Sequence, residues 1–480
     1  MKKTFIYAAF LVAVLCGTPK AFAQSASQIP PLTPELTQAA DAAAQQFKTA
    51  ADEKEQKTVL KTLFKKRKKE ELLSLGNYYL QKKNLDLALK TVEELYHDDG
   101  TYVPGLMLYG EVMYARKEYG KAGEKFDEAI YQNAELKEAY LKKAQVYKYV
   151  SPSTAEGSLM ELLNIDPEYK EAMRELASIY YSENKIPEAT KAYEDYFKIE
   201  ANPDLDAMKE YAILLFLDKK FPESLAQVTK TLAKDPKDIS LNRMKFYDLI
   251  GTNDFEAANA QKDQFFGQYN DTLYNYSDYM YLGKLQRKQR DYAASIASYE
   301  KSISLNKDYA ANYKEIGDVY DRAGQYDKAI FSYKAYISKL GETVPATELY
   351  SFGRVYYDAA SSITDVNDPK LKQYITEGDT LFAQVTTRTD SYLGPFWRAR
   401  LNSLADPNNP LDNVKTYYEE AAKRLAGKDN ISGEKECLRY AAFYYMKKDM
   451  NAEAREYCNK ILAIDPNDSL AKQIKAVVGE

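Results

Sequence analysis

Small and aromatic residues recur along most of the chain at nearly constant intervals. Around Gly317, the small residue is followed by Tyr320, Tyr326, Ala329 and Tyr333, at positions +3, +9, +12 and +16. The same frame, complete or partial, begins again at intervals of about 34 residues. Its anchor positions are Gly76, Gly110, Ala144, Ala177, Ala212, Phe246, Gly283, Gly317 and Gly353. Phe246 is the exception, because it puts a large side chain where a small one is expected.

This spacing predicts a repeated pair of helices, A and B. The small residue of helix A marks the point where helix B crosses closely, and a larger side chain there would push the two helices apart. An aromatic residue at position +16 fills the gap between neighbouring pairs. A single hairpin cannot bury its apolar face alone, so the pairs must stack into one continuous core. The expected fold class is therefore all-α, an α-solenoid.

The frame resembles the tetratricopeptide repeat, which has a period of about 34 residues and a proline near the end of each unit. Pro167, Pro236 and Pro466 stand near that closing position. The resemblance implies a right-handed solenoid of about eleven stacked helix-turn-helix repeats with helical caps. Two further anchors, near Leu401 and Ala442, follow wider spacings that indicate insertions at about 359–375 and 404–412.

The resulting organisation has seven parts. A flexible lead-in (24–34) and an N-terminal capping helix region (35–68) precede a regular array (69–358). Irregular repeats with insertions (359–434), a last repeat (435–468) and a C-terminal capping helix (469–480) follow. The segment 1–23 forms the remaining part.

That N-terminal segment, 1–23, has the pattern of a secretory signal peptide. Lys2 and Lys3 precede an apolar run from Phe5 to Cys16, and a small-x-small site ends at Ala23. Cleavage is expected between Ala23 and Gln24, which would place the chain in the periplasm or at the periplasmic face of a bacterial outer membrane. Lipid attachment at Cys16 is the less favoured alternative, because Leu15 stands where such junctions carry a small residue.

Composition argues against most enzyme chemistries. The chain has one histidine (His97) and three cysteines, which excludes a triad built on a second imidazole, a zinc site with two histidines, an iron facial triad and a four-cysteine cluster. His97 itself is expected to be a solvated residue at a helix end. We found no nucleotide-binding, nucleophile-elbow or calcium-loop motif, so the sequence predicts a protein that is not an enzyme, with no cofactor and no metal.

The net charge of the chain indicates which kinds of partner it can bind. The 71 acidic and 66 basic residues give a mildly acidic chain, which argues against nucleic-acid binding. The densest basic run, Lys65 to Lys69, is expected to be the solvated face of an amphipathic helix, although peripheral association with an anionic membrane stays open.

Cys437 and Cys458 stand on opposite sides of the turn near Asp449. In an oxidising compartment they could form a disulfide that pins the last hairpin. They could equally be two buried thiols that pack as small apolar side chains.

The resemblance also implies a binding groove lined by the positions +1, +4 and +5 from each anchor. Carried onto this sequence, the groove is apolar and aromatic in its centre, then cationic, then mixed. Its predicted residues are Tyr181, Ile213, Phe216, Leu217, Tyr247, Ile250, Lys284, Arg287, Lys288, Arg354 and Tyr357. Such a groove suits an extended or helical protein segment.

The leading hypothesis is accordingly a non-enzymatic scaffold or adaptor in the cell envelope that binds one or more proteins, with its oligomeric state open. The alternative is a ligand-binding receptor component for glycan or nutrient capture, in which flat aromatic faces would hold the sugar. An enzyme built on a carboxylate pair is a third, residual class.

Overall fold

The computed structural model describes residues 29–341 and 344–479. The predicted leader, with Cys16 and the cleavage site between Ala23 and Gln24, lies outside the described residues. Within them the secondary structure consists of 25 α-helices and two short 3-10 helices, without a strand. The all-α prediction is confirmed.

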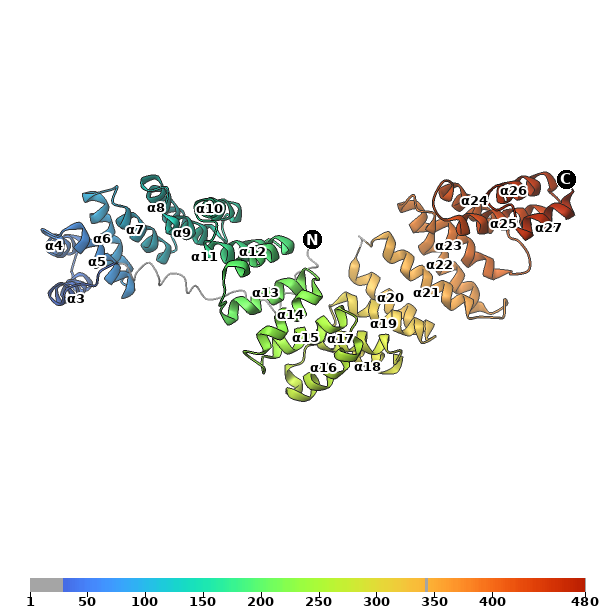
Figure 1. Ribbon diagram of the computed structural model, residues 1–480, viewed down its shortest axis with the longest axis horizontal. Helices are drawn as coiled ribbons and strands as arrows, with labels where there is room; N and C mark the ends of the chain where they lie inside the picture. Colours follow the sequence, from blue (N-terminus) through green and yellow to red (C-terminus); the bar gives the residue numbers. More distant parts are fainter. Residues whose placement is uncertain (1–28, 342–343, 480) are drawn as a thin grey trace. The chain divides into compact units, whose positions relative to one another are not determined.

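The chain divides into two compact units, Met1–Thr252 and Asn253–Glu480. In each, the helices follow one another in chain order (Figure 1). The helices of the first unit are α3 (Pro34–Thr49), α4 (Glu53–Phe64), α5 (Lys69–Gln81), α6 (Leu85–Asp98), α7 (Val103–Ala115), α8 (Tyr119–Gln132), α9 (Lys137–Tyr147), α10 (Pro152–Ile165), α11 (Lys170–Ser182), α12 (Ile186–Ile199), α13 (Leu205–Leu217), α14 (Phe221–Leu232) and α15 (Ile239–Gly251).

The second unit continues the alternation of A and B helices. Its elements are α16 (Phe255–Gln268), η3 (Asp271–Leu273), α17 (Tyr276–Lys288), α18 (Tyr292–Leu305), α19 (Ala310–Arg322), α20 (Tyr326–Leu340), α21 (Ala346–Ser361), α22 (Pro369–Arg388), α23 (Leu393–Asn402), η4 (Ser403–Ala405), α24 (Asp412–Leu425), α25 (Ile431–Lys447), α26 (Asn451–Ile464) and α27 (Ser469–Val478). From α5 to α26 the order matches the eleven predicted repeats, with α27 after the last.

The residues ahead of the array form two helices, α3 and α4, joined by a short connection. The hairpin docks on the first repeat through Tyr79, whose hydroxyl donates to the carbonyl of Ala40 over 2.9 Å. Residues 65–68 of the basic run lie between α4 and α5, where Lys66 has a φ of 58°, and Lys69 is the first residue of α5. The expectation that this run occupies the face of an amphipathic helix is therefore wrong, because the helix ends before it.

Close contact between a glycine of helix A and an aromatic ring of helix B holds the clearest repeats together. A methyl group built on Gly110 would lie 2.6 Å from Phe126, and one on Gly317 would lie 2.8 Å from Tyr333. Gly283 stands in the same relation to Tyr299. In each pair the ring stands at position +16 from the glycine, as the frame predicts. The ring also reaches the next repeat: that of Tyr333 stacks on Phe352 of α21 at 5.3 Å.

A left-handed backbone residue marks most of the turns between helices A and B. Eight such residues stand at position +7 from their anchors: Lys83, Lys117, Asn184, Lys219, Asn253, Arg290, Gly324 and Asp449. Only Gly324 is a glycine, although glycine adopts this conformation most readily. The anchors Ala144 and Gly353 have no such residue, and both belong to repeats in which the sequence frame is weaker.

The first predicted insertion is ordered as part of its hairpin. A methyl group on Gly353 would lie 2.6 Å from Phe382, so the small-to-aromatic contact is kept although the insertion separates the two more widely in sequence. The extra residues lengthen α21 and α22 to 16 and 20 residues and form the connection between them.

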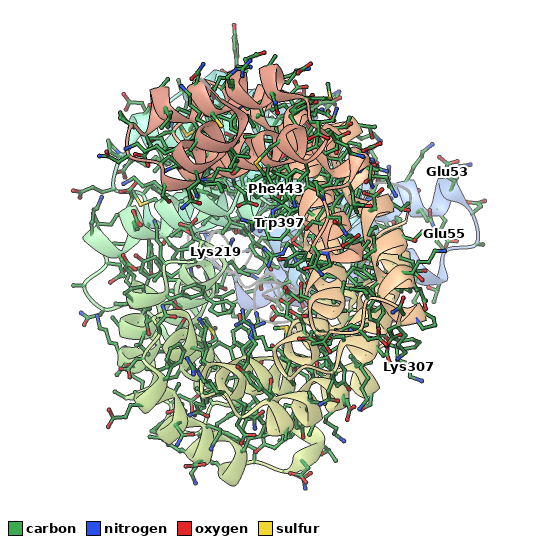
Figure 2. All side chains as sticks on the ribbon, turned by 90° about the vertical axis from the view of Figure 1, so that its right-hand side faces the viewer. Glu53, Glu55, Lys219, Lys307, Trp397 and Phe443 are labelled. Carbon is green, nitrogen blue, oxygen red and sulfur yellow. The ribbon has the colours of Figure 1, made fainter. Side chains whose placement is uncertain are left out.

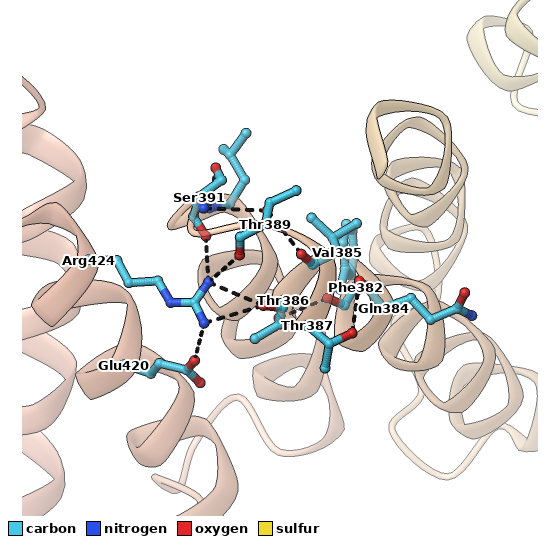
Figure 3. Close-up of polar contacts among 10 residues, drawn as sticks. Phe382, Gln384, Val385, Thr386, Thr387, Thr389, Ser391, Glu420 and Arg424 are labelled. Atoms are coloured by element: carbon cyan, nitrogen blue, oxygen red, sulfur yellow. Dashed lines mark hydrogen bonds and ion pairs between the residues drawn. The ribbon is translucent and has the colours of Figure 1, made fainter. Parts of the chain in front are cut away.

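Arg424 of α24 caps the end of the long helix α22 (Figure 3). Its guanidinium donates to the carbonyls of Thr389 and Ser391 over 2.9 and 3.0 Å and also reaches the carbonyl of Thr386, while Glu420 accepts a further bond at 2.6 Å. A cation satisfies carbonyls that a helix end leaves without partners. The end of α22 is thereby fixed to the next repeat.

The Gly110→Ala variant tests the contact between the paired helices. The added methyl group would overlap the buried Phe126 ring, so we expect the free energy of unfolding to fall by about 1–3 kcal/mol in urea denaturation. The matched control is Gly157→Ala in α10, where the methyl group meets nothing within 4 Å. This control should gain about 0.5–1 kcal/mol through helix propensity. Equal effects at both positions would contradict the packing assignment.

Exchanging residues at the left-handed turns tests the backbone conformation. Lys219→Gly should stabilise the first unit by about 0.5–1 kcal/mol, because the φ of 60° strains any residue with a Cβ atom. Gly324→Ala should destabilise the second unit by about 1 kcal/mol for the same reason. Thermal unfolding of the two variants should therefore shift in opposite directions, and a shift in the same direction would refute the assignment.

Candidate functional site

The predicted apolar centre of the groove is largely covered. Ile213, Phe216, Tyr247 and Ile250 have exposed fractions of only 2%, 7%, 4% and 9%. The Phe216 ring lies 6.1 Å from that of Tyr247 and 5.8 Å from that of Phe221. These side chains therefore offer little surface to a partner in this structure, since rings of neighbouring helices pack on one another.

Tyr181 and Leu217, the other two predicted residues of this part, are half-buried. They leave some side-chain surface accessible at the edge of the covered group.

The predicted cationic section is largely neutralised by the chain itself. Arg287 of α17 pairs with Glu315 of α19 at 3.0 Å, and Lys284 approaches the same carboxylate at 3.7 Å. Lys288 remains exposed. The difference from the sequence expectation has a plain cause: α19 carries Glu315, which faces the bases of the preceding A helix, α17.

Ion pairs of this kind recur between neighbouring repeats and were not foreseen. A lysine of an A helix meets an acid that stands about 30 residues later, after the intervening B helix has ended. The pairs are Lys69–Asp99, Lys137–Asp166, Lys170–Glu200, Lys209–Asp238 and Lys435–Asp465. In four of the pairs the acid is the C-cap residue of that B helix, and Asp238 is the N-cap residue of α15. The repeat period itself is the signal that could have revealed them.

Many tyrosines bond to carboxylates rather than standing free. Tyr193 donates to Glu210 of the next repeat, and Tyr299 donates to Glu315 over 3.3 Å. Burial, followed by the adjacent carboxylates, raises the pKa of both phenols well above the usual value. The rings of Tyr193 and Tyr299 therefore fill the core while their hydroxyls bond to acids at its edge.

Arginine and aromatic side chains converge on α21 and α23. The Arg354 guanidinium lies 3.7 Å above the centre of the Trp397 ring, and that of Arg400 lies 4.8 Å from it. Tyr357 meets Trp397 edge-on at 5.0 Å. We call Arg354, Tyr357, Trp397 and Arg400 the Arg–aromatic patch. Cations over aromatic faces attract the ring electrons, so these side chains hold one another in place.

The Arg–aromatic patch is partly open to solvent. The side chains of Arg354 and Arg400 are 35% and 33% exposed, and Tyr357 is half-buried. Trp397 is only 7% exposed and lies within the side chains of the second unit (Figure 2). Of the predicted groove residues, Arg354 and Tyr357 lie together in this patch and keep accessible surface.

Carboxyl groups of α19 and α21 adjoin this patch. Asp321 is half-buried, and its Oδ1 atom has no hydrogen-bond partner within the described structure. Burial, together with the charges of Asp358 and Asp318, raises the pKa of Asp321 to about 7. Asp358 pairs with Arg354 at 3.5 Å.

A comparison with known families identifies part of this array. Residues 282–343 match the family model of the tetratricopeptide repeat. The match spans the hairpins in which Gly283 and Gly317 contact their tyrosines. No curated protein matches the chain.

Solved tetratricopeptide repeat proteins are similar to parts of the chain. The C-terminal part of one from Cytophaga hutchinsonii is 23% identical, covering 55% of this chain and 98% of that one with a TM-score of 0.47. One from Parabacteroides merdae is 15% identical, with 52% and 97% covered and a TM-score of 0.34.

A third solved structure, Naa15/Naa10 bound to HypK-THB, is 13% identical, with 85% of this chain and 65% of that one covered and a TM-score of 0.39.

The two cysteines of the last predicted tetratricopeptide repeat are free and buried. Cys437 belongs to the apolar cluster that contains Tyr418 and Leu425, whereas Cys458 packs with Leu438, Ala442 and helix α27. The structure thus shows the second of the two arrangements that the sequence left open. Burial raises the pKa of both thiols, which keeps them protonated.

Other candidates from the sequence have no distinctive geometry. His97 is exposed in the last turn of α6, as expected for a solvated helix end. Within residues 29–341 and 344–479, no three His, Cys, Asp or Glu side chains are grouped as metal ligands. In the same ranges no helix combines the length and the apolar character needed to cross a bilayer.

The pH dependence of stability tests the environment of Asp321. Its pKa is higher in the folded chain than in the unfolded one, so the folded state holds the proton more tightly and loses stability as pH rises through about 7. Between pH 5 and pH 8 we expect the wild type to lose on the order of 1–2 kcal/mol more unfolding free energy than Asp321→Asn, after solvent screening.

The control for this comparison, measured by urea denaturation at both pH values, is Asp308→Asn. The Asp308 side chain is fully exposed, so its pH dependence should equal that of the wild type. If Asp321→Asn loses as much unfolding free energy between pH 5 and pH 8 as the wild type does, another group causes the pH dependence.

Proposed function

We propose that the chain is a non-enzymatic scaffold that binds a partner protein through the Arg–aromatic patch of its second unit. The match of residues 282–343 to the tetratricopeptide repeat supports this class of function, since stacked helical repeats present extended binding surfaces. The single observation that carries the proposal is the convergence of two arginines, a tyrosine and a tryptophan on two neighbouring A helices.

These residue types dominate the binding energy of protein interfaces, where arginine, tyrosine and tryptophan are enriched at hot spots. Here the side chains are already held by ring and ion contacts. The bidentate bonds from Arg400 to Glu436 of α25 add to this order. A partner would therefore lose little side-chain entropy on the scaffold's side when it docks.

We extend the proposal to the cell envelope on the basis of the leader pattern in residues 1–23. Export would bring the scaffold to partners in the periplasm or at the outer membrane. The glycan-receptor alternative is disfavoured by the burial of Trp397. This tryptophan, the only one in the sequence, is 7% exposed and has Arg354 over one face, so it offers no open platform for a sugar ring.

Affinity capture with a matched variant tests the proposed surface. The full chain is used as bait for an envelope extract, and bound proteins are quantified by mass spectrometry. We expect at least one protein whose capture falls about tenfold or more with Arg354→Ala/Tyr357→Ala, as for loss of two hot-spot residues. The Lys307→Ala/Tyr131→Ala control removes a cation and a ring from exposed positions elsewhere, and it should capture that protein normally (Figure 2 shows Lys307).

A capture profile that is identical for the wild type and Arg354→Ala/Tyr357→Ala would refute the proposed surface. Fractionation of cells that express the full-length gene tests the location separately. Recovery of the chain, shortened to begin at Gln24, in the periplasmic fraction is the expected result, and recovery of the uncleaved chain in the cytoplasm would contradict it.

A further inference from the structure

The first insertion forms one wall of a surface cleft in the second unit. Two adjoining pockets of about 400 Å³ each share Tyr326 and Ser362. The opposite wall is the turn from Gly324 to Lys328. Both walls are tied together, because Asp327 accepts hydrogen bonds from Lys370 and Tyr374 over 2.8 and 2.6 Å. We call this feature the insertion cleft.

One pocket of the insertion cleft combines carboxylates, hydroxyls and an aromatic ring. It is lined by Asp321, Arg322, Tyr326, Asp358, Ser361 and Ser362. Within the described residues, one oxygen of the Asp321 carboxyl has no donor, and Asp358 pairs with Arg354 at 3.5 Å. The negative charges of Asp321 and Asp358 repel each other, because the site is partly desolvated.

Such a lining selects a cation that carries N–H donors. A guanidinium or ammonium group would neutralise Asp321 and Asp358, donate to the serine hydroxyl oxygens and lay its stem against the Tyr326 ring. An incoming carboxylate would instead meet the two acids. Two arginines of the chain adjoin these acids: Arg354 pairs with Asp358, and Arg322 is exposed. In the part of the chain that the structure describes, the Oδ1 atom of Asp321 still has no donor.

We propose that the insertion cleft receives an arginine or lysine side chain of the bound partner protein. This inference rests on the proposed function and adds the chemistry of the partner: a basic residue that enters the cleft beside the Arg–aromatic patch. The cleft adjoins that patch through Asp358 and Arg354, which stand one helical turn apart on α21.

The cleft predicts that binding depends on pH. The groups that face Asp321 are Asp318, Arg322, Tyr326, Arg354 and Asp358, drawn from α19, α20 and α21. Because the pKa of Asp321 is about 7, the carboxyl is largely protonated at pH 6 and ionised at pH 8. A cationic side chain binds the ionised form, so affinity should rise across this range.

Fluorescence anisotropy with a fluorescein-labelled hexa-arginine peptide and the full chain tests the inference at physiological ionic strength. We expect Asp321→Asn/Asp358→Asn to weaken binding by about tenfold, as for loss of charge-assisted hydrogen bonds. Asp308→Asn, with the same change of charge at an exposed carboxylate, should stay within about twofold of the wild type. Between pH 6 and pH 8 the wild-type affinity should rise severalfold, and Asp321→Asn should remove this rise.

A second variant, Tyr326→Leu, keeps both carboxylates and is expected to weaken hexa-arginine binding about two- to fivefold through loss of the ring. If circular dichroism shows that the double variant does not fold, the binding of hexa-arginine to Tyr326→Leu tests the cleft instead. Equal weakening by Asp308→Asn, or equally tight binding of a hexa-glutamate peptide, would overturn the inference. Spermidine binding with the same dependence on Asp321 while hexa-arginine fails would overturn it too.

The two proposals can fail separately. If the partner protein is still lost with Arg354→Ala/Tyr357→Ala while the cleft variants bind hexa-arginine like the wild type, the cleft assignment is wrong and the scaffold function stands. If hexa-arginine binding depends on Asp321 but capture ignores the Arg–aromatic patch, the proposed surface is wrong.

Discussion

The structure depends on one close contact within the repeats. A glycine of helix A, which has no side chain, lies against an aromatic ring of helix B in the same pair. Gly110, Gly283, Gly317 and Gly353 each leave room for one ring and no more. A methyl group would already overlap it, so the distance between paired helices is tightly set. The distance between helices A and B also sets where each pair meets the next, because the repeats stack on one another along the chain.

The ring that fills this space also connects one repeat to the next. Tyr299 touches its own glycine and bonds to Glu315 on the following A helix, where Arg287 reaches the same carboxylate. A buried tyrosine ring thus holds its hydroxyl at the edge of the core, where it bonds to a carboxylate and fixes the position of the charged groups there. The Arg–aromatic patch is the accessible form of this arrangement, in which Arg354 and Arg400 lie over the one tryptophan.

The fold could be predicted from the sequence because small and aromatic residues recur at a fixed spacing in each repeat. The anchors, the +16 rings and even the insertion before Phe382 follow from counting residues. The candidate site was readable only in part. Positions such as Phe216 and Tyr247 were predicted to line the groove, yet their exposure depends on how rings of adjacent helices pack, which the spacing does not encode. The pairing of Lys284 and Arg287 with Glu315 likewise requires the contact between successive A helices.

The most direct test of the central claim is a double-mutant cycle between Gly353 and Phe382, which stand on either side of the first insertion. Gly353→Ala, Phe382→Leu and the double variant are compared by urea denaturation. The account predicts that the smaller leucine makes room for the methyl group, so the double variant is more stable than the sum of the single effects by about 1–2 kcal/mol. Additive effects, within about 0.5 kcal/mol, would contradict the claim that this contact sets the distance between the helices.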